Sequence, residues 1–268
     1  MEDPDLVTSR GGSIYNDIGT KDAQFAAFES LTSSTPYDPY AALINSYAYI
    51  SDSKFWLTAS NFEYTAENIT NPPVFQNFTS LPQLTSTMRV SNLTDFTLEI
   101  AGTPSTNRRQ LFVTGTYGNS AKLMASIFDI SNRTVQALDV TGMTYSLSFQ
   151  PLPTAITSKA ASRGGNSLGL SEADGNLFNL LLTVSWDNVA DDERIEQHAK
   201  DLFQQSEDEA RKLGLYHKYL YLNYAASWQD PFSGYGDEQK AKLQAVSRKY
   251  DPKGVFQKQV SGGFKLFD

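Results

Sequence analysis

Residues 177–186 read LFNLLLTVSW, an almost uninterrupted run of apolar and β-branched residues. A half-buried strand alternates polar and apolar side chains, whereas a strand covered on both faces does not. The run therefore predicts a strand that is buried on both faces.

The segment that follows, residues 191–213, predicts the clearest helix of the chain. Small and apolar side chains recur there at helical spacing, at Ile195, Ala199, Leu202, Phe203, Ser206 and Ala210. Gly214 comes directly afterwards, where a helix commonly ends. One face of this helix is expected to be apolar and the other to carry its charged residues.

Outside these two segments, the sequence predicts several shorter elements. The expected strands are residues 13–18, a hairpin formed by 41–51 and 55–63, and residues 109–117, 143–151 and 220–224. The expected helices are residues 20–31, 120–131 and 237–250. Residues 95–101 begin another structured segment. Strands with interspersed helices and few connections of βαβ length indicate an α+β fold. Residues 1–268 are expected to form a single domain, in which 225–268 are a C-terminal tail and helix.

Composition limits the partners. The chain has 268 residues, 40% of them hydrophobic, and a net charge of -8, which disfavours nucleic acid and anionic lipid. It has no apolar run long enough for a membrane helix, and its acidic start is unlike a secretory signal, so a cytoplasmic protein is expected. With two His and no Cys, neither a disulfide nor a zinc site is expected.

Six short segments have a recognisable order along the chain. They are NPPVF at 71–75, MRVSNLTDF at 88–96, RGGNSLGL at 163–170, YLYLNY at 219–224, WQDP at 228–231 and YDPKGVF at 250–256. Together they resemble the substrate domain and C-terminal end of fungal FAD-linked oxidoreductases of the berberine-bridge-enzyme-like family. The resemblance runs from about Gly11 to Phe264.

The resemblance implies an antiparallel β-sheet with helices packed on one face and a substrate wall on the other. Family members carry a large FAD-binding domain upstream, and Met1 stands where that domain would end. The chain contains no G-x-G-x-x-G after a strand and lacks the His and Cys that tether FAD in many relatives. We therefore expect no bound cofactor here, although FAD serves the full-length relatives.

The resemblance also identifies candidate site residues in YLNY. Tyr224 matches the tyrosine that often serves as catalytic base in the family, and Tyr221 and Asn223 would contact the substrate. A phenol acts as a base only in a pocket that lowers its pKa or holds the proton. Packing in a strand is the alternative role for Tyr224.

Three further polar residues are substrate-binding candidates. Asn166 would line the site, although its position beside two glycines is also typical of a turn. Arg89 and Gln150 would supply hydrogen-bond donors from strand ends, opposite Tyr224 and Asn223. Each is also a common surface residue.

Both histidines are expected to be structural. His198 lies among acidic residues of the long predicted helix, which indicates a solvated face. His217 stands between Tyr216 and Tyr219, close to YLNY, and is the better functional candidate of the two.

Three functions remain open at this point. The first is a flavin-free enzyme of secondary metabolism that cyclises or isomerises a hydrophobic or polycyclic metabolite, for example by a Diels–Alder reaction. The second is the substrate-binding part of an FAD-dependent oxidoreductase whose flavin domain is separate or missing. The third is a non-catalytic binding protein. A homodimer is expected, because the surface that contacts the flavin domain in relatives would otherwise be exposed.

Overall fold

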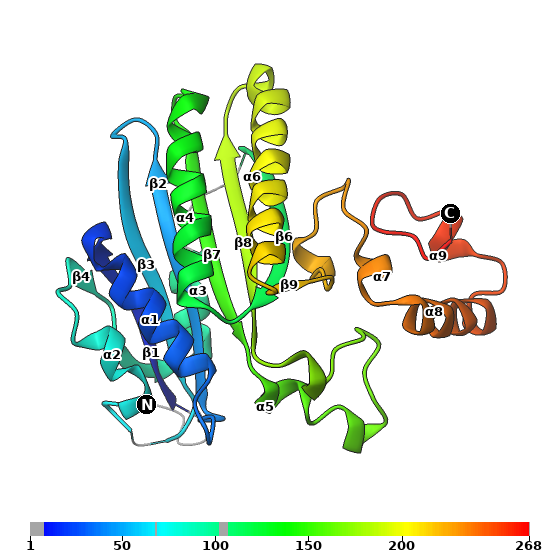
Figure 1. Ribbon diagram of the computed structural model, residues 1–268, viewed down its shortest axis with the longest axis horizontal. Helices are drawn as coiled ribbons and strands as arrows, with labels where there is room; N and C mark the ends of the chain where they lie inside the picture. The colour runs from blue at the N-terminus through cyan, green and yellow to red at the C-terminus, as the bar shows by residue number, and fades with distance from the viewer. Residues whose placement is uncertain (1–7, 68, 102–106, 268) are drawn as a thin grey trace.

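The computed structural model describes residues 8–67, 69–101 and 107–267, and its centre is one antiparallel β-sheet (Figure 1). The strands are β1 (Thr8–Asp17), β2 (Ala41–Ile50), β3 (Phe55–Tyr64), β4 (Thr85–Ser86), β5 (Arg89–Asn92), β6 (Arg109–Gly118), β7 (Thr144–Leu152), β8 (Leu177–Trp186) and β9 (Tyr216–His217). Their order is β4-β1-β3-β2-β7-β8-β6-β9, and β5 also pairs with β1. The predicted α+β class and antiparallel sheet are confirmed.

Three long helices cover one face of the sheet (Figure 1). They are α1 (Lys21–Thr32), α4 (Ala121–Val135) and α6 (Asp192–Lys212), and the others are α2 (Gln76–Thr79), α3 (Leu93–Ala101), α5 (Thr154–Thr157), α7 (Pro231–Gly234), α8 (Asp237–Tyr250) and α9 (Val255–Lys258). The short α3 departs from the predicted arrangement and lies against β1 on the opposite face, where the Ser13 hydroxyl donates to Glu99. No helix in the described ranges is long and apolar enough to cross a membrane.

Strand β8 is covered on both faces, as its sequence predicts. Toward the long helices, Phe178, Leu180 and Leu182 are fully buried. On the other face, Asn179 and Leu181 are each only 8% exposed. A polar Asn within this run is thus placed on the sheet face opposite the helices.

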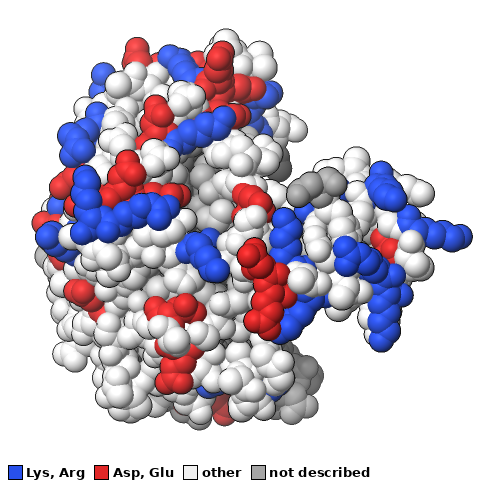
Figure 2. Space-filling view, turned by 45° about the vertical axis from the view of Figure 1, so that its right-hand side comes forward, with Lys and Arg blue, Asp and Glu red and all other residues white. Residues whose placement is uncertain are grey.

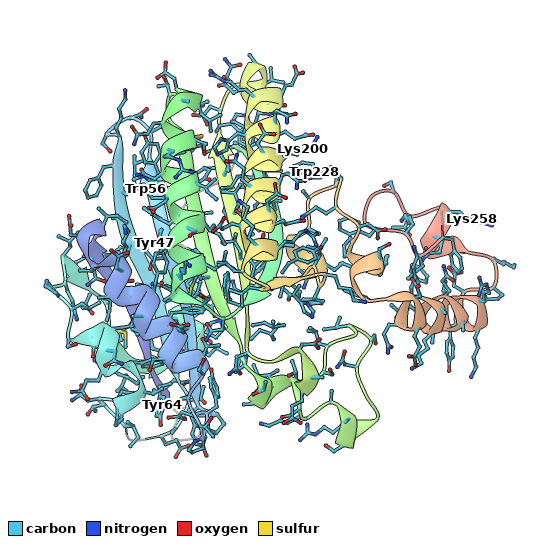
Figure 3. All side chains as sticks on the ribbon, in the orientation of Figure 1. Tyr47, Trp56, Tyr64, Lys200, Trp228 and Lys258 are labelled. Carbon is cyan, nitrogen blue, oxygen red and sulfur yellow. The ribbon has the colours of Figure 1, made fainter. Side chains whose placement is uncertain are left out.

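Aromatic side chains fill the space between the sheet and the helices. Tyr47 of β2 and Trp56 of β3 both pack against Phe128 of α4, with ring centroids 5.6 and 4.9 Å apart (Figure 3). Such ring pairs combine a large buried area with favourable edge contacts. The main hydrophobic core therefore lies on the helix-covered side.

The opposite side of the sheet, which we call the far face, is rich in small polar residues. Alternation along β2 and β7 directs Ser46 and Ser148 to it, and their hydroxyl oxygens lie 2.7 Å apart. On the neighbouring strands, Asn61 donates to the Ser13 hydroxyl at 2.9 Å. The far face thus carries polar groups that pair with one another, and its role as a substrate wall stays a prediction.

Residues 218–230 are fixed to the free edge of β6. The Gln229 side chain donates to the Thr114 carbonyl at 2.7 Å and accepts from the Thr114 amide at 3.2 Å. The side-chain amide of Gln229 therefore pairs with the backbone N–H and C=O of Thr114, as the backbone of a neighbouring strand would. Lys200 of α6 adds a cation–π contact, 4.8 Å from the ring centre of Trp228 (Figure 3).

The predicted strand at 220–224 is wrong. The structure has a two-residue strand, β9, followed by a 3-10 turn at Leu222–Tyr224. Pairing with β6 stops after His217, because the amide of Tyr219 donates to His217 Nδ1 instead of to a strand. The alternation of Tyr and Leu is typical of a half-buried strand, but the hydrogen bond to the His217 side chain ends the backbone pairing with β6.

The C-terminal tail, residues 237–267, projects from the sheet (Figure 1) and has no buried residue. Its apolar side chains include Val246, Tyr250 and Phe256, which are 53%, 73% and 67% exposed. Lys and Arg predominate on the same projection (Figure 2). The division of the chain at residue 225 stays a prediction.

We expect the tail to contact a second copy of the chain in a homodimer. Exposed apolar patches mark interfaces, and a chain of net charge -8 offers an acidic surface to a basic tail. Light scattering over a range of protein concentrations should give the mass of two chains. The mass of one chain at every concentration would contradict this expectation.

Candidate functional site

A cavity of about 550 Å³ lies at one end of the far face. Its walls come from the ends of β7 and β8, from the segment 156–170 and from three tyrosines of the chain after β9. Those tyrosines are Tyr219, Tyr221 and Tyr224. The cavity therefore joins the YLNY segment to RGGNSLGL, two of the segments on which the family resemblance rests.

Tyr224 is held by its neighbours on three sides. Its hydroxyl oxygen accepts a hydrogen bond from Gln150 Nε2 at 3.1 Å. Its ring meets the edges of Tyr221 and Phe112, with centroids 4.7 and 6.2 Å apart. In a 3-10 turn, residues three apart lie above one another, which explains the contact between Tyr221 and Tyr224. Because its oxygen accepts from Gln150, the phenolic proton is left to donate to a group in the cavity.

Gln150 belongs to a polar row that crosses three strands of the far face. It pairs with Asn179 of β8, which in turn pairs with Thr116 of β6. The Thr116 hydroxyl donates to Asn179 Oδ1 at 2.7 Å. The sheet, rather than a loop, therefore fixes the position of the amide that contacts Tyr224.

Tyr219 is the most buried aromatic group of the cavity wall. Its side chain stacks on Tyr235 with centroids 5.8 Å apart, and the residue is 3% exposed. Burial raises the pKa of Tyr219, and the nearby phenols of Tyr235 and Tyr221 add to the effect. Tyr219 therefore keeps its proton and is available as a hydrogen-bond donor.

Asn166 lines the same cavity, but its polar atoms serve the loop. Its Nδ2 donates to the Leu170 carbonyl at 2.7 Å, and its Oδ1 accepts from the Leu168 amide at 2.9 Å. These bonds match the turn interpretation of this residue. Asn166 shapes the wall and has little hydrogen-bonding capacity left for a ligand.

Two predicted site residues are not brought to the cavity. Arg89 lies on β5, at the far end of the sheet, in ion pairs with Asp95 at 2.6 Å and with Glu99. Asn223 is exposed and donates to the Tyr221 hydroxyl at 2.8 Å. The expectation that Arg89 stands opposite Tyr224, and that Asn223 lines the site, is therefore corrected.

His198 does not lie on a solvated face. It is 8% exposed on the inner side of α6, with its Nε2 3.5 Å from the Tyr145 hydroxyl. Burial lowers the pKa of His198 to about 4, so the ring is neutral at physiological pH. The acidic residues that suggested solvation occupy the other sides of the helix.

His217 has two structural partners. Its Nδ1 accepts from the Tyr219 amide, so Nε2 carries the proton that reaches Asp174 at 3.2 Å. Although burial opposes it, hydrogen bonds from Ser171 and His217 lower the pKa of Asp174. Within the described ranges, no three His, Asp or Glu side chains gather into a metal site.

The residues of the cavity wall that sequence reasoning missed include Tyr219, Asn179, Lys159 and Arg163. A signal existed for Asn179, because it is the one amide in the apolar run of β8. Arg163 is the first residue of RGGNSLGL, but nothing in the sequence marked its side chain or that of Lys159 as part of a cavity wall.

The chain has clear relatives among fungal proteins. It is 37% identical over 260 residues to the FAD-dependent monooxygenase sdcF of Emericella nidulans, which covers 96% of this chain and 54% of that protein. It is 34% identical over 270 residues to the FAD-dependent monooxygenase elcE of Phaeosphaeria nodorum, which covers 96% of this chain and 77% of that protein. The chain spans about half the length of the Emericella nidulans relative and of several other fungal FAD-dependent monooxygenases that it matches. No protein-family model matches it.

Solved structures share the fold at low sequence identity. 6-Hydroxy-D-nicotine oxidase from Arthrobacter nicotinovorans superposes with a TM-score of 0.69 at 12% identity, over 94% of this chain and 54% of that one. Berberine bridge enzyme from Eschscholzia californica gives 0.64 at 12% identity, over 97% and 56%. These similarities establish the architecture of the sheet and helices.

Proposed function

Because the chain belongs to the family of fungal FAD-dependent monooxygenases, we propose that it forms the substrate-binding half of an FAD-linked oxidoreductase. The observation that carries this proposal is the hydrogen bond from Gln150 to Tyr224 at the wall of the 550 Å³ cavity. A cavity of this size accommodates a small-molecule metabolite.

In this proposal, Tyr224 exchanges a proton with a hydroxyl or carbonyl oxygen of the metabolite. Gln150 holds the phenol oxygen, so that the O–H group points to the substrate. The rings of Tyr221 and Phe112 prevent Tyr224 from turning away. A hydrogen-bond donor that is already oriented stabilises the charge that develops in the transition state without a cost of reorganisation, and this lowers the reaction barrier.

The residues present do not fit FAD by themselves. The pyrophosphate of a dinucleotide is commonly bound where backbone amides converge, at a glycine-rich turn between a strand and a helix. The described turns that lead to α1, α4 and α6 carry no glycine cluster.

A flavin-free cyclase or isomerase is the second candidate. One observation favours it: the cavity wall combines the apolar faces of tyrosine rings with the oriented hydroxyl of Tyr224, and these are the groups that such chemistry uses. Ring closure of a folded substrate, including a Diels–Alder reaction, requires mainly orientation and one or two hydrogen-bond donors.

Mass spectrometry of metabolite extracts incubated with the purified chain separates the two candidates. Cyclisation or isomerisation conserves substrate mass and needs no flavin. An oxidoreductase half should leave the metabolite unchanged alone and oxidise it only when the FAD-bearing half of the Emericella nidulans relative is added. A product of unchanged mass from the chain alone would contradict the first candidate.

We predict that the purified chain is colourless and does not bind added FAD appreciably. The reason is the lack of a phosphate cradle among the described residues. Titration of FAD, followed by its fluorescence, checks this. Binding at micromolar FAD would show that the chain holds the cofactor without its second half.

A further inference from the structure

We propose that the cavity beside Tyr224 recognises an aromatic metabolite through an anionic oxygen, either a carboxylate or a phenolate. This inference rests on the proposed function and names the chemical class of its substrate.

The charge of the cavity wall is opposite to that of the chain. Lys159 and Arg163 line the cavity, and none of its lining residues is Asp or Glu, although the chain has a net charge of -8. Within the described ranges, neither cationic side chain forms an ion pair or hydrogen bond. Two uncompensated positive charges at one cavity favour a ligand with negative charge.

A phenol of the cavity wall supplies an independent observation. Tyr219 is 3% exposed, and its hydroxyl has no hydrogen-bond partner among the described residues. In the described ranges, the unpartnered side-chain atoms that are sealed from solvent are Ser51 Oγ, Tyr117 Oη and Asn119 Oδ1, so the Tyr219 hydroxyl remains accessible. Because the Tyr219 side chain lines the cavity, this hydroxyl can donate to a ligand there.

The wall therefore presents several donors to one space. Tyr219 and Tyr224 contribute hydroxyl protons, and Lys159 and Arg163 contribute charged N–H groups. Hydrogen bonds between ionised groups are roughly twice as strong as neutral ones, so an oxygen anion matches this set best. Tyrosine rings form the apolar part of the wall, and planar rings pack well against them.

Paired titrations with naphthoate and naphthamide test the inference, because the two ligands share ring and size but differ in charge. Naphthoate should bind at least about tenfold more tightly to the wild-type chain, since charge-assisted hydrogen bonds are roughly twice as strong as neutral ones. The Lys159→Met/Arg163→Met variant should reduce this ratio to about threefold or less. Lys122 and Arg133 are exposed, as Lys159 and Arg163 are, but they lie on α4 outside the cavity wall, so the Lys122→Met/Arg133→Met variant should keep the wild-type ratio.

The possible outcomes distinguish the anion preference of the cavity from its proposed role in binding substrate. Equal affinity of both ligands for the wild-type chain would overturn the anion preference and leave the proposed substrate cavity in place. Failure of both ligands to bind would overturn the two together. ADP serves as a third ligand, because a nucleotide phosphate is the other source of an anion. If ADP binds with dependence on Lys159 and Arg163 while naphthoate does not, the cations serve a nucleotide and the inference is wrong.

Discussion

Turnover at the cavity should fall about tenfold or more in a Tyr224→Phe variant. The substitution removes one hydroxyl and keeps the ring that packs between Tyr221 and Phe112. A loss of about 1.4 kcal/mol of transition-state stabilisation is a factor of ten in rate, and one well-placed donor contributes at least that much. Rates of product formation by mass spectrometry, together with the free energy of unfolding, measure both consequences.

Tyr40→Phe is the matched control. It makes the same substitution at an exposed tyrosine that does not line the cavity. Its turnover should remain near wild type. If Tyr224→Phe also retains full turnover at unchanged stability, Tyr224 is a packing residue and the chemistry occurs elsewhere.

Long periodic segments were predicted well, because their signal is local. The helix expected at 191–213 is observed at Asp192–Lys212, and the helix expected at 237–250 matches α8. The apolar run LFNLLLTVSW is the buried strand β8. The strand expected at 220–224 failed for a different reason. Its alternating pattern is typical of a strand, but the backbone amide of Tyr219 donates a hydrogen bond to the His217 ring. The periodicity of apolar residues does not reveal a hydrogen bond of this kind.

The candidate site was predicted in part, and the failures have a topological cause. Tyr224, Tyr221, Gln150 and Asn166 all line one cavity, although they come from three separate segments of the sequence. Arg89 is elsewhere, because β5 pairs with β1 at the opposite end of the sheet from β9. Strand order depends on contacts between distant segments, which single-segment patterns do not specify.

Stability should depend on pH through His198, because its pKa differs between the folded and unfolded states. Burial lowers the folded-state pKa from its ordinary 6.5 to about 4. Between these values the unfolded chain binds more protons than the folded one, so the free energy of unfolding falls as pH decreases from about 6.5 to 4. A shift of this size corresponds to roughly 3 kcal/mol. In a His198→Gln variant, this contribution should be absent.

Glu63 should act in the opposite direction and provides the internal control. Burial raises its pKa from 4.5 to about 7, with Arg89 opposing and Glu99 assisting the shift. The folded state then binds more protons than the unfolded chain, so the free energy of unfolding falls as pH rises through this window. Urea unfolding at a series of pH values should give a steeper increase of stability with pH for Glu63→Gln and a flatter one for His198→Gln. If both substitutions change the slope in the same direction, at least one of these buried groups does not titrate as its environment requires.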